Sequence, residues 1–273
     1  MPLTTAECDY VRKVVRQRSG IVLEEEKAYL VESRLTTLAR LQGFPSIQGM
    51  LAQCQAQSTG PLREMVVEAL TTNETSFFRD VQPFEALRKA ILPELVAARG
   101  KDRRLNIWCG ASSTGQEPYS LAMLIREHFP QLNTWDVRVV ATDLSTDVLA
   151  RAREGKYSQL EVNRGLPAAF LPKYFQRVGL NWQLKDEVRK MIDFRPLNLI
   201  EPWPDLGRPD LVMMRNVLIY FDVPTKKDIL GRVQRMLRPD GYLMLGGAET
   251  TYNLNDSFVR VDLERAGAYR LKP

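Results

Sequence analysis

Residues 105–120, LNIWCGASSTGQEPYS, carry the strongest indication of the fold class. The stretch opens with the apolar run Leu105–Cys109, passes through small residues between Gly110 and Gly115, and then takes up a helical pattern. A strand that enters a helix through such a turn lets a ligand approach the backbone at the carboxyl edge of a sheet. The two glycines have the spacing of a phosphate loop, but Glu117 stands where that loop carries Ser or Thr, and its carboxylate would repel phosphates. The loop therefore suits a ligand with positive charge, and a plain tight turn is the alternative.

Beyond residue 105 the chain alternates short apolar runs with amphipathic stretches. The apolar runs are Leu105–Cys109, Val137–Thr142, Leu211–Met214 and Tyr242–Leu245. Amphipathic stretches such as Tyr119–Phe129 and Thr225–Leu237 separate them. This alternation predicts a doubly wound α/β sheet with helices on its faces. Phe258–Asp262 and Ala268–Leu271 predict an antiparallel pair of strands at the end.

The first seventy residues predict a bundle of short helices. Thr4 and Glu7 have the spacing of a capping box at the start of the first helix. A second helix is expected from about Glu24 to Gln42. Ser46 is suited to cap a third helix, and Pro61 suits the first turn of a fourth.

These patterns divide the chain into three parts. We expect a helical N-terminal domain over residues 1–72, a linker with a connecting helix over 73–91, and the sheet domain over 92–273. The alternation of strands and helices weakens between about residues 156 and 194, which predicts an insertion in the sheet domain. Within this insertion, Leu180–Val188 predicts a small hairpin.

The composition is that of an ordinary globular protein, with 273 residues of which 44% are hydrophobic and 26% charged. The chain has three cysteines without a C-x-x-C pair, so we expect no disulfide framework and no zinc cluster. His128 is the single histidine, which argues against a histidine-based metal site and disfavours Ser-His-Asp or Cys-His catalysis. Every apolar run is shorter than the roughly 18 residues that span a bilayer, so we expect a cytoplasmic protein without membrane insertion.

The positive charge is concentrated in one segment. Residues 151–195 carry ten Lys and Arg against five Asp and Glu, and this surplus of five equals the net charge of +5 of the whole chain. We expect a solvated face there and no nucleic acid.

Asp143 ends the second predicted strand, where a carboxylate can accept hydrogen bonds from ribose hydroxyls. The alternative is that Asp143 caps the helix that follows. Pro239–Gly241 predicts a turn between a helix and a strand, and it resembles the corresponding turn of class I methyltransferases. That turn indicates a fold and no catalytic role.

Five motifs follow one another in order along the chain. They are TTNETSFFRD (71–80), CGASSTGQEPYS (109–120), ATDLS (141–145), FRPLNL (194–199) and MRNVLIYF (214–221). Together they resemble the successive motifs of the CheR family, the chemoreceptor glutamate O-methyltransferases, and the resemblance covers almost the whole chain. It implies an all-α N-terminal domain and a class I, Rossmann-like S-adenosylmethionine methyltransferase domain with a small antiparallel β subdomain.

The resemblance implies a site for S-adenosylmethionine, with S-adenosylhomocysteine as the product and no metal. The implied contacts are Asn73, Thr75 and Arg79 from the linker, Glu117 at the methionine amino group, Asp143 at the ribose, Asn198 and Leu199 at the adenine, and Arg215 and Asn216 beside the methionine moiety. Arg79 and Tyr220 match the pair that would orient the substrate carboxylate. Taken singly, each has a structural alternative, such as a surface ion pair for Arg79, sheet packing for Tyr220 or a turn for Asn198. A glutamate carboxylate has a reference pKa of about 4.3, so it is already ionised in the cytosol and needs no general base.

The implied partner is the cytoplasmic helical domain of methyl-accepting chemoreceptors, with a monomeric enzyme recruited to receptor arrays. Arg34 and Arg40 align with helix positions that the family uses against the receptor helix. They lie about 120° apart on an ideal helix, and solvated arginines are the alternative. The glycine-rich hairpin loop of members that bind a receptor C-terminal pentapeptide is shortened here to Gly179–Trp182, which predicts a pentapeptide-independent member.

Other functions stay open at this point. A methyltransferase acting on RNA or on a small molecule is compatible with the basic segment, but interleaved stacking aromatics and an RNA-binding motif are missing. A non-catalytic adaptor that keeps the nucleotide pocket is opposed by the presence of Arg79, Glu117, Asp143 and Tyr220. A nicotinamide dehydrogenase is disfavoured because G-x-G-x-x-G is absent.

Overall fold

The computed structural model describes residues 3–57 and 60–273. The chain divides into two compact units. The first contains the chain up to Thr72 together with Tyr220–Thr225, and the second contains Asn73–Ile219 and Lys226–Pro273. Each unit is described separately below.

The first unit is helical, as the sequence predicts. Its helices are α1 (Thr5–Ser19), α2 (Ala28–Leu41), α3 (Ile47–Ala56) and α4 (Pro61–Leu70). The capping box of Thr4 and Glu7 forms at the start of α1, the Ser46 side chain caps α3, and Pro61 occupies the first turn of α4. Their apolar faces meet in a core that includes Val15 and Leu35. One boundary differs from the prediction: Glu25–Lys27 forms a 3-10 turn, and α2 starts only at Ala28. Glu24, which precedes the 3-10 turn, makes no side-chain cap bond.

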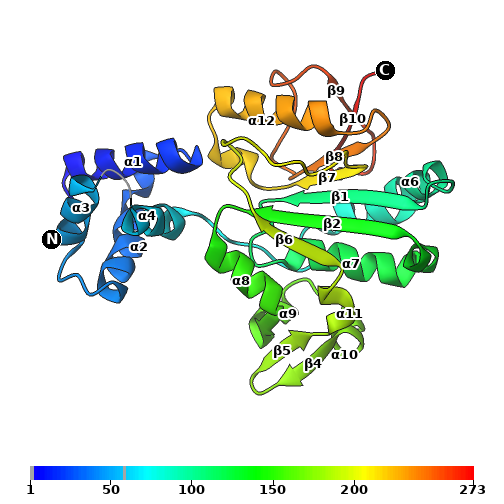
Figure 1. The fold of residues 1–273 in the computed structure, drawn as a ribbon, viewed down its shortest axis with the longest axis horizontal. Coiled ribbons are helices and arrows are strands. Elements are labelled where there is room, and N and C mark those ends of the chain that lie inside the picture. The colour runs from blue at the N-terminus through cyan, green and yellow to red at the C-terminus, as the bar shows by residue number, and fades with distance from the viewer. Residues whose placement is uncertain (1–2, 58–59) are drawn as a thin grey trace. The chain divides into compact units, whose positions relative to one another are not determined.

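The second unit is built on a seven-stranded sheet in the order β6-β2-β1-β7-β8-β10-β9 (Figure 1). Its strands are β1 (Arg104–Gly110), β2 (Asp136–Asp143), β6 (Ile192–Pro196), β7 (Leu211–Met214), β8 (Tyr242–Leu245), β9 (Phe258–Arg260) and β10 (Ala268–Leu271). The first five strands in the spatial order pair in parallel, and β10 joins β8 and β9 antiparallel. This arrangement confirms the predicted Rossmann-like α/β class and the antiparallel pair at the end.

Helices cover both faces of this sheet. Figure 1 shows α7 (Gln116–His128) and α8 (Thr146–Glu154) on one face and α12 (Val223–Met236) on the other. A helical segment made of α5 (Val81–Ala86), a π turn (Leu87–Ile91) and α6 (Leu92–Ala98) leads into β1. Strands β7 and β8 are buried along their whole length, as expected for central strands of a parallel sheet.

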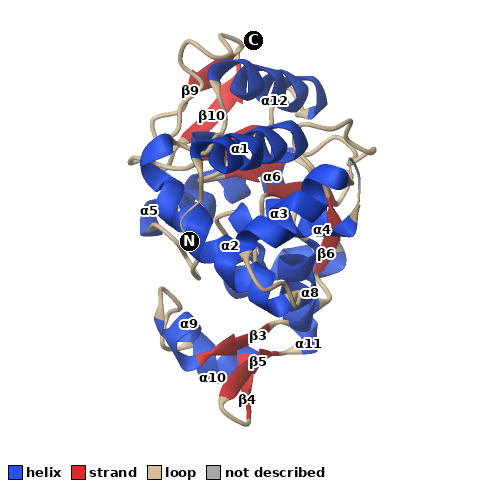
Figure 2. Cartoon of the chain, turned by 90° about the vertical axis from the view of Figure 1, so that its left-hand side faces the viewer, coloured by secondary structure: helices blue, strands red, loops and turns tan. Residues whose placement is uncertain are grey.

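The insertion folds as a small antiparallel sheet in the order β3-β5-β4. Its strands are β3 (Lys156–Ser158), β4 (Phe175–Val178) and β5 (Asn181–Leu184), and Figure 2 shows them with the short helices α9 (Gln159–Asn163), α10 (Phe170–Tyr174) and α11 (Asp186–Arg189). The hairpin predicted at Leu180–Val188 is wrong in position. The hairpin lies at residues 175–184, because the left-handed turn between its strands falls at Gly179, which has φ of +62°. Residues 186–189 form a short helix instead of a strand.

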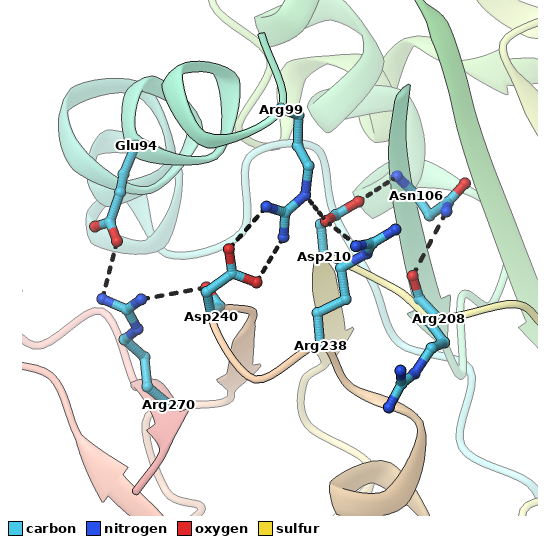
Figure 3. A network of polar contacts seen from close by, with 8 residues as sticks. All are labelled: Glu94, Arg99, Asn106, Arg208, Asp210, Arg238, Asp240 and Arg270. Carbon is cyan, nitrogen blue, oxygen red and sulfur yellow. Dashed lines mark hydrogen bonds and ion pairs between the residues drawn. The ribbon is translucent and has the colours of Figure 1, made fainter. Parts of the chain in front are cut away.

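A partly buried charge network joins α6 to the segments that precede β1, β7 and β8 (Figure 3). Arg99, which follows α6, donates to Asp210 over 2.6 Å and to both oxygens of Asp240 over 2.7 and 2.6 Å. Asp210 is fully buried and also accepts the backbone N–H of Asn106 at 2.8 Å. The Arg99 guanidinium holds the pKa of Asp240 below its usual range. Because removal of one partner from a buried ion pair costs about 3–5 kcal/mol, this network fixes α6 against the starts of β1, β7 and β8.

Candidate functional site

The turn between β1 and α7 lies where the order of the sheet reverses. From β1 the chain runs outward to β2 and β6, and it returns to β7 and β8 on the other side. The crevice beyond the carboxyl ends of strands at such a reversal is where open α/β sheets bind ligands. Gly115 has φ of +92°, and a Cβ there would lie 3.1 Å from both Ala152 Cβ and Tyr119 Cε2. The position therefore requires glycine, and the turn that the sequence singles out is a tightly packed one.

Asp143 holds the β1 turn in place from the end of β2. One carboxylate oxygen accepts the backbone N–H of Ser113 at 2.8 Å, and the other accepts that of Ser145 at 3.0 Å. The cap of α8 is the Ser145 side chain, which accepts from Val148, so Asp143 is not the residue that caps this helix. A carboxylate can accept several hydrogen bonds at once. The ribose contact stays a prediction.

Arg215, in the motif at 214–221, binds residues of the motifs at 71–80 and 109–120. Its side chain is fully buried at the end of β7 and donates to Glu117 at 2.6 Å and to Asp80 at 2.8 Å. It also donates to the backbone carbonyl of Arg79 at 3.0 Å. Glu117 is in the first turn of α7, with 13% of its side chain exposed. The three charged side chains carry one positive and two negative charges, which leaves an unbalanced negative charge at the carboxyl edge of the sheet.

The negative charge of Glu117 also acts on Cys109 at the end of β1. Burial raises the pKa of the Cys109 thiol well above its usual value, and Glu117 adds to the effect. The thiol is therefore neutral at physiological pH. Cys109 is fully buried and packs in the hydrophobic core, the setting of structural rather than reactive cysteines.

Residues 73–80 lie along the same edge. Ser113 Oγ donates to the carbonyl of Asn73 at 2.8 Å, and the N–H of Phe78 donates to Ser120 Oγ at 2.9 Å. The Arg79 side chain donates to the carbonyl of Glu74 at 3.0 Å. These contacts bring the segment that carries the predicted residues Asn73, Thr75 and Arg79 onto the β1 turn and α7.

Backbone strain is concentrated in these segments. Among the residues that the structure describes, nine non-glycine residues have positive φ. Five of them fall in the motifs at 71–80, 109–120 and 214–221, namely Phe78, Asp80, Ala111, Ser113 and Asn216. Strained backbone of this kind clusters at ligand and active sites, because only the surrounding structure can maintain it.

Asn198 and Leu199 follow β6, two strands away from β1. The N–H of Leu197 donates to the carbonyl of Asp143 at 2.9 Å, which connects this segment to the end of β2. Asn198 Oδ1 accepts the N–H of Ile200 at 3.3 Å, and Leu199 is buried with its carbonyl accepting from Trp203 at 3.1 Å. Asn198 thus does form a turn, and its predicted contact with adenine stays a prediction.

The remaining predicted residues belong to the first unit. Arg34 on α2 donates to the carbonyl of Thr71 at 2.7 Å, and Arg40 near the end of α2 is exposed. The carbonyl of Tyr220 accepts the N–H of Val22 at 2.9 Å, and the neighbouring Asp222 pairs with Arg16. The pairing of Arg79 with Tyr220 at a substrate stays a prediction.

Glu249 was not predicted from the sequence, yet it lies in this site. It is buried in the loop after β8, and it accepts backbone N–H groups from the loop after β7. The signal that could have identified it is an acidic residue among small residues, GGAET (246–250), directly after an apolar strand. Such a carboxylate needs hydrogen-bond partners in order to be buried.

The residues present fit S-adenosylmethionine. Within residues 3–57 and 60–273, Ser112 Oγ and Asn216 Oδ1 are among the few buried side-chain atoms that have no hydrogen-bond partner. A buried polar atom is costly unless it is bonded, so both are suited to a polar ligand at the ends of β1 and β7. Glu117 and Asp143 offer carboxylates to an ammonium and to hydroxyls. This donor and acceptor set matches an amino acid joined to a nucleoside.

The described part of the chain holds neither a metal-binding cluster nor a helix able to span a membrane. No three His, Cys, Asp or Glu side chains there lie close enough to share a metal ion. None of the helices described is both long and apolar enough to cross a bilayer.

Comparisons with known proteins agree with the resemblance in the motifs. The family model "CheR methyltransferase, SAM binding domain" matches residues 73–266, and "CheR methyltransferase, all-alpha domain" matches residues 6–71. Chemotaxis protein methyltransferase 1 of Pseudomonas aeruginosa is 44% identical over 277 aligned residues, which cover 100% of both chains. Chemotaxis protein methyltransferase Cher2 of Pseudomonas putida is 40% identical over 99% of this chain and 100% of its own.

Among solved structures, the glycopeptide N-methyltransferase MtfA complexed with sinefungin matches 64% of this chain and 58% of its own, with a TM-score of 0.34 and 18% identity. The family models and full-length relatives carry the assignment. This chain belongs to the CheR methyltransferase family and is an S-adenosylmethionine-dependent methyltransferase.

Proposed function

We propose that this enzyme transfers the methyl group of S-adenosylmethionine to glutamate side chains of bacterial chemoreceptors for chemotactic adaptation. The products are glutamate methyl esters and S-adenosylhomocysteine. Relatives that match over the full length are named chemotaxis protein methyltransferases, which supports the acceptor class. The observation that carries the site is the charge cluster around the buried Arg215, with Glu117 and the half-exposed Asp80, because it joins three motifs at one edge of the sheet.

The charge of this cluster suits the donor. S-adenosylmethionine, when bound, supplies an electrophilic methyl group on a cationic sulfonium. Glu117, oriented by Arg215, would receive the amino group of the methionine moiety, and Arg215 and Asn216 would border that moiety. Asp143 would accept the ribose hydroxyls, Asn198 and Leu199 would contact the adenine, and Asn73, Thr75 and Arg79 would contact the donor from the 71–80 segment. The unbalanced negative charge then neutralises a positively charged ligand.

The acceptor needs orientation and no proton removal. A glutamate carboxylate is ionised at neutral pH, so its oxygen is already nucleophilic. Arg79 and Tyr220 would hold the carboxylate and leave one oxygen lone pair directed at the methyl group. Positioning alone can supply roughly 7–11 kcal/mol of barrier reduction, which fits a site without histidine.

The proposed macromolecular partner is the cytoplasmic helical domain of a chemoreceptor, bound by a monomeric enzyme recruited to receptor arrays in the cytoplasm. Arg40 is the more accessible of the two predicted contacts, because Arg34 already donates to the Thr71 carbonyl.

We also infer that no receptor tail pentapeptide is required. Strands β4 and β5 join through two residues, Gly179 and the 86% exposed Leu180, so this hairpin has no long loop to hold a peptide. Saturable binding of a receptor tail peptide in a titration would overturn that inference.

The test is to incubate the enzyme with S-adenosylmethionine and a soluble cytoplasmic receptor fragment, and to map methyl groups by peptide mass spectrometry. We expect methyl groups on glutamate side chains of the fragment. Methylation confined to other residues, to RNA or to small molecules in the mixture would replace the proposal with the corresponding acceptor. No methylation of any acceptor, despite measured donor binding, would favour the adaptor function.

A further inference from the structure

The buried carboxylate of Glu249 accepts hydrogen bonds from five backbone N–H groups. Oε2 accepts from Asn216 at 2.7 Å and from Gly246 at 2.6 Å. Oε1 accepts from Val217 at 2.9 Å, from Leu218 at 2.7 Å and from Ile219 at 3.3 Å. The residue as a whole is 8% exposed. These bonds connect the loop after β8 to the loop after β7.

The loop after β7 depends on this carboxylate for its shape. Residues 216–219 direct four consecutive N–H groups at one point, and a 3-10 turn begins at Leu218. Successive N–H groups arranged in this way form a concavity that binds an anion. Asn216 has φ of +58°, a conformation that costs free energy unless its surroundings maintain it. The Glu249 carboxylate is an internal anion that occupies this concavity.

Gly246 makes the close approach possible. A Cβ at this position would lie 2.7 Å from Asn216 Nδ2, 2.8 Å from Glu249 Oε2 and 2.9 Å from Asn216 N. A side chain there would separate the two loops and break the bonds to Glu249. The glycine and the glutamate therefore act together on the loop that begins at Arg215.

This loop carries two residues predicted to border the methyl donor. Arg215 precedes the four bonded N–H groups directly, and its guanidinium orients Glu117. Asn216 is the first residue of this loop that Glu249 binds, and its Oδ1 has no hydrogen-bond partner within residues 3–57 and 60–273. A shift of the loop would move both side chains away from the edge of the sheet.

We propose that Glu249 is a positioning residue for methyl transfer, acting through residues 215–219 to set the donor site. The inference rests on the proposed function for its effect on turnover. Within the described part of the chain the Glu249 carboxylate accepts its hydrogen bonds from backbone N–H groups, so Glu249 acts through the loop and is not a catalytic residue. Its role is to keep Arg215 and Asn216 in the conformation that binds the donor.

The test compares Glu249→Gln with Glu249→Asp and with Glu264→Gln, an exposed glutamate of the same unit. Gln keeps the size but places an NH2 group among N–H donors, while Asp keeps the charge on a shorter side chain. Hydrogen exchange of the amides of residues 216–219 is measured first, then S-adenosylhomocysteine affinity by calorimetry, then kcat and KM. Exchange and affinity need no methyl acceptor, so they report on Glu249 even if chemoreceptor glutamates are not the acceptor.

We expect Glu249→Gln to accelerate exchange at residues 216–219 selectively and to weaken S-adenosylhomocysteine binding about 10- to 100-fold, as misplacement of a binding group does. Glu249→Asp should retain part of the amide protection and part of the S-adenosylhomocysteine affinity. Glu264→Gln should change neither the exchange nor the affinity. Gly246→Ala should reproduce the effect of Glu249→Gln on exchange, since the added Cβ breaks the same bonds. Unchanged exchange at 216–219, or a uniform acceleration over the whole chain with unchanged affinity, would overturn the proposal.

Discussion

The fully buried guanidinium of Arg215 donates to the Glu117 carboxylate at 2.6 Å, connecting the end of β7 to the first turn of α7. In the sequence these residues stand 98 positions apart and belong to two different motifs. The contact gives Glu117 a fixed direction, and the negative charge of Asp80 balances the guanidinium. Glu117 can therefore offer its charge to a cationic ligand without being neutralised by Arg215.

Glu117→Gln is expected to raise the Kd of S-adenosylmethionine about 10- to 100-fold. A hydrogen bond to a charged group is worth about 1.5–3 kcal/mol, and the amide removes the charge while keeping the shape. Isothermal titration calorimetry measures the change. Glu187→Gln, which removes an exposed ion pair with Arg126, is the matched control and should leave Kd unchanged. An unaltered Kd for Glu117→Gln would mean that Glu117 does not contact the donor.

Arg79→Ala is expected to lower kcat by about 100-fold or more, because the acceptor carboxylate loses its orientation. Steady-state methyl transfer to a receptor fragment measures this effect, with Arg88→Ala as a control, since Arg88 pairs with Glu85 on the connecting helix. Near-normal turnover of Arg79→Ala would remove this residue from the site.

The strands illustrate how far the sequence alone predicts the fold. Leu211–Met214 and Tyr242–Leu245 were predicted to the residue, because each run is wholly apolar and wholly buried. In the insertion, the prediction of strand structure through Val188 failed. Strand β5 ends at Leu184, and Val188 lies in a short helix with its side chain buried. A single apolar residue is buried equally well in a strand or a helix, so Val188 did not distinguish the two.

The site shows a different limit. Glu117 and Asp143 were identified because each directly follows a predicted strand or its turn, where local sequence fixes the position. Glu249 could not be identified in this way, because four of its five partners lie 30 to 33 residues earlier in the chain and all five are backbone groups, which carry no sequence signal. The roles of the individual site residues at bound ligands stay predictions.

Gly165→Ala is expected to destabilise the protein by about 3 kcal/mol or more. Its φ is +90°, and a Cβ there would overlap the carbonyl oxygen of Phe77, which packs between Tyr157 and Phe175. Gly179→Ala is the matched control, since φ is +62° but nothing lies within 4 Å of the added Cβ, so only about 1–2 kcal/mol of backbone strain is expected. Urea denaturation measures both. Equal losses would show that the Phe77 contact contributes nothing.

Asp240→Asn is expected to lower stability at pH 7 on the order of 1 kcal/mol, because it removes a partly exposed ion pair with Arg99. Arg99 lowers the pKa of Asp240 in the folded protein, so the stabilisation is present above the unfolded value of about 3.9 and is lost as pH falls through the folded pKa. Urea midpoints of wild type and variant should therefore begin to converge below about pH 4 and meet only below the folded pKa of Asp240. A gap that stays constant with pH would contradict this role.

Arg40→Glu is expected to raise the KM for a receptor fragment about fivefold with little change in kcat, since an exposed charge contributes up to about 1 kcal/mol. Arg34→Glu should also raise KM and, in addition, lower the Tm, because it loses the bond to the Thr71 carbonyl. Arg103→Glu, an exposed position before β1, is the control. An unchanged KM in the double charge reversal of Arg34 and Arg40 would discard α2 as the receptor contact.

The most direct test of carboxylate methylation is the release of volatile methanol. Chemoreceptor-rich membranes are incubated with the enzyme and methyl-labelled S-adenosylmethionine, washed, and treated with base, which hydrolyses methyl esters and leaves most other methyl adducts intact. We expect the wild-type enzyme to place base-labile label on the receptor and Arg79→Ala to abolish it. Stable label that survives base, or an absence of label from an enzyme that binds the donor, would contradict it.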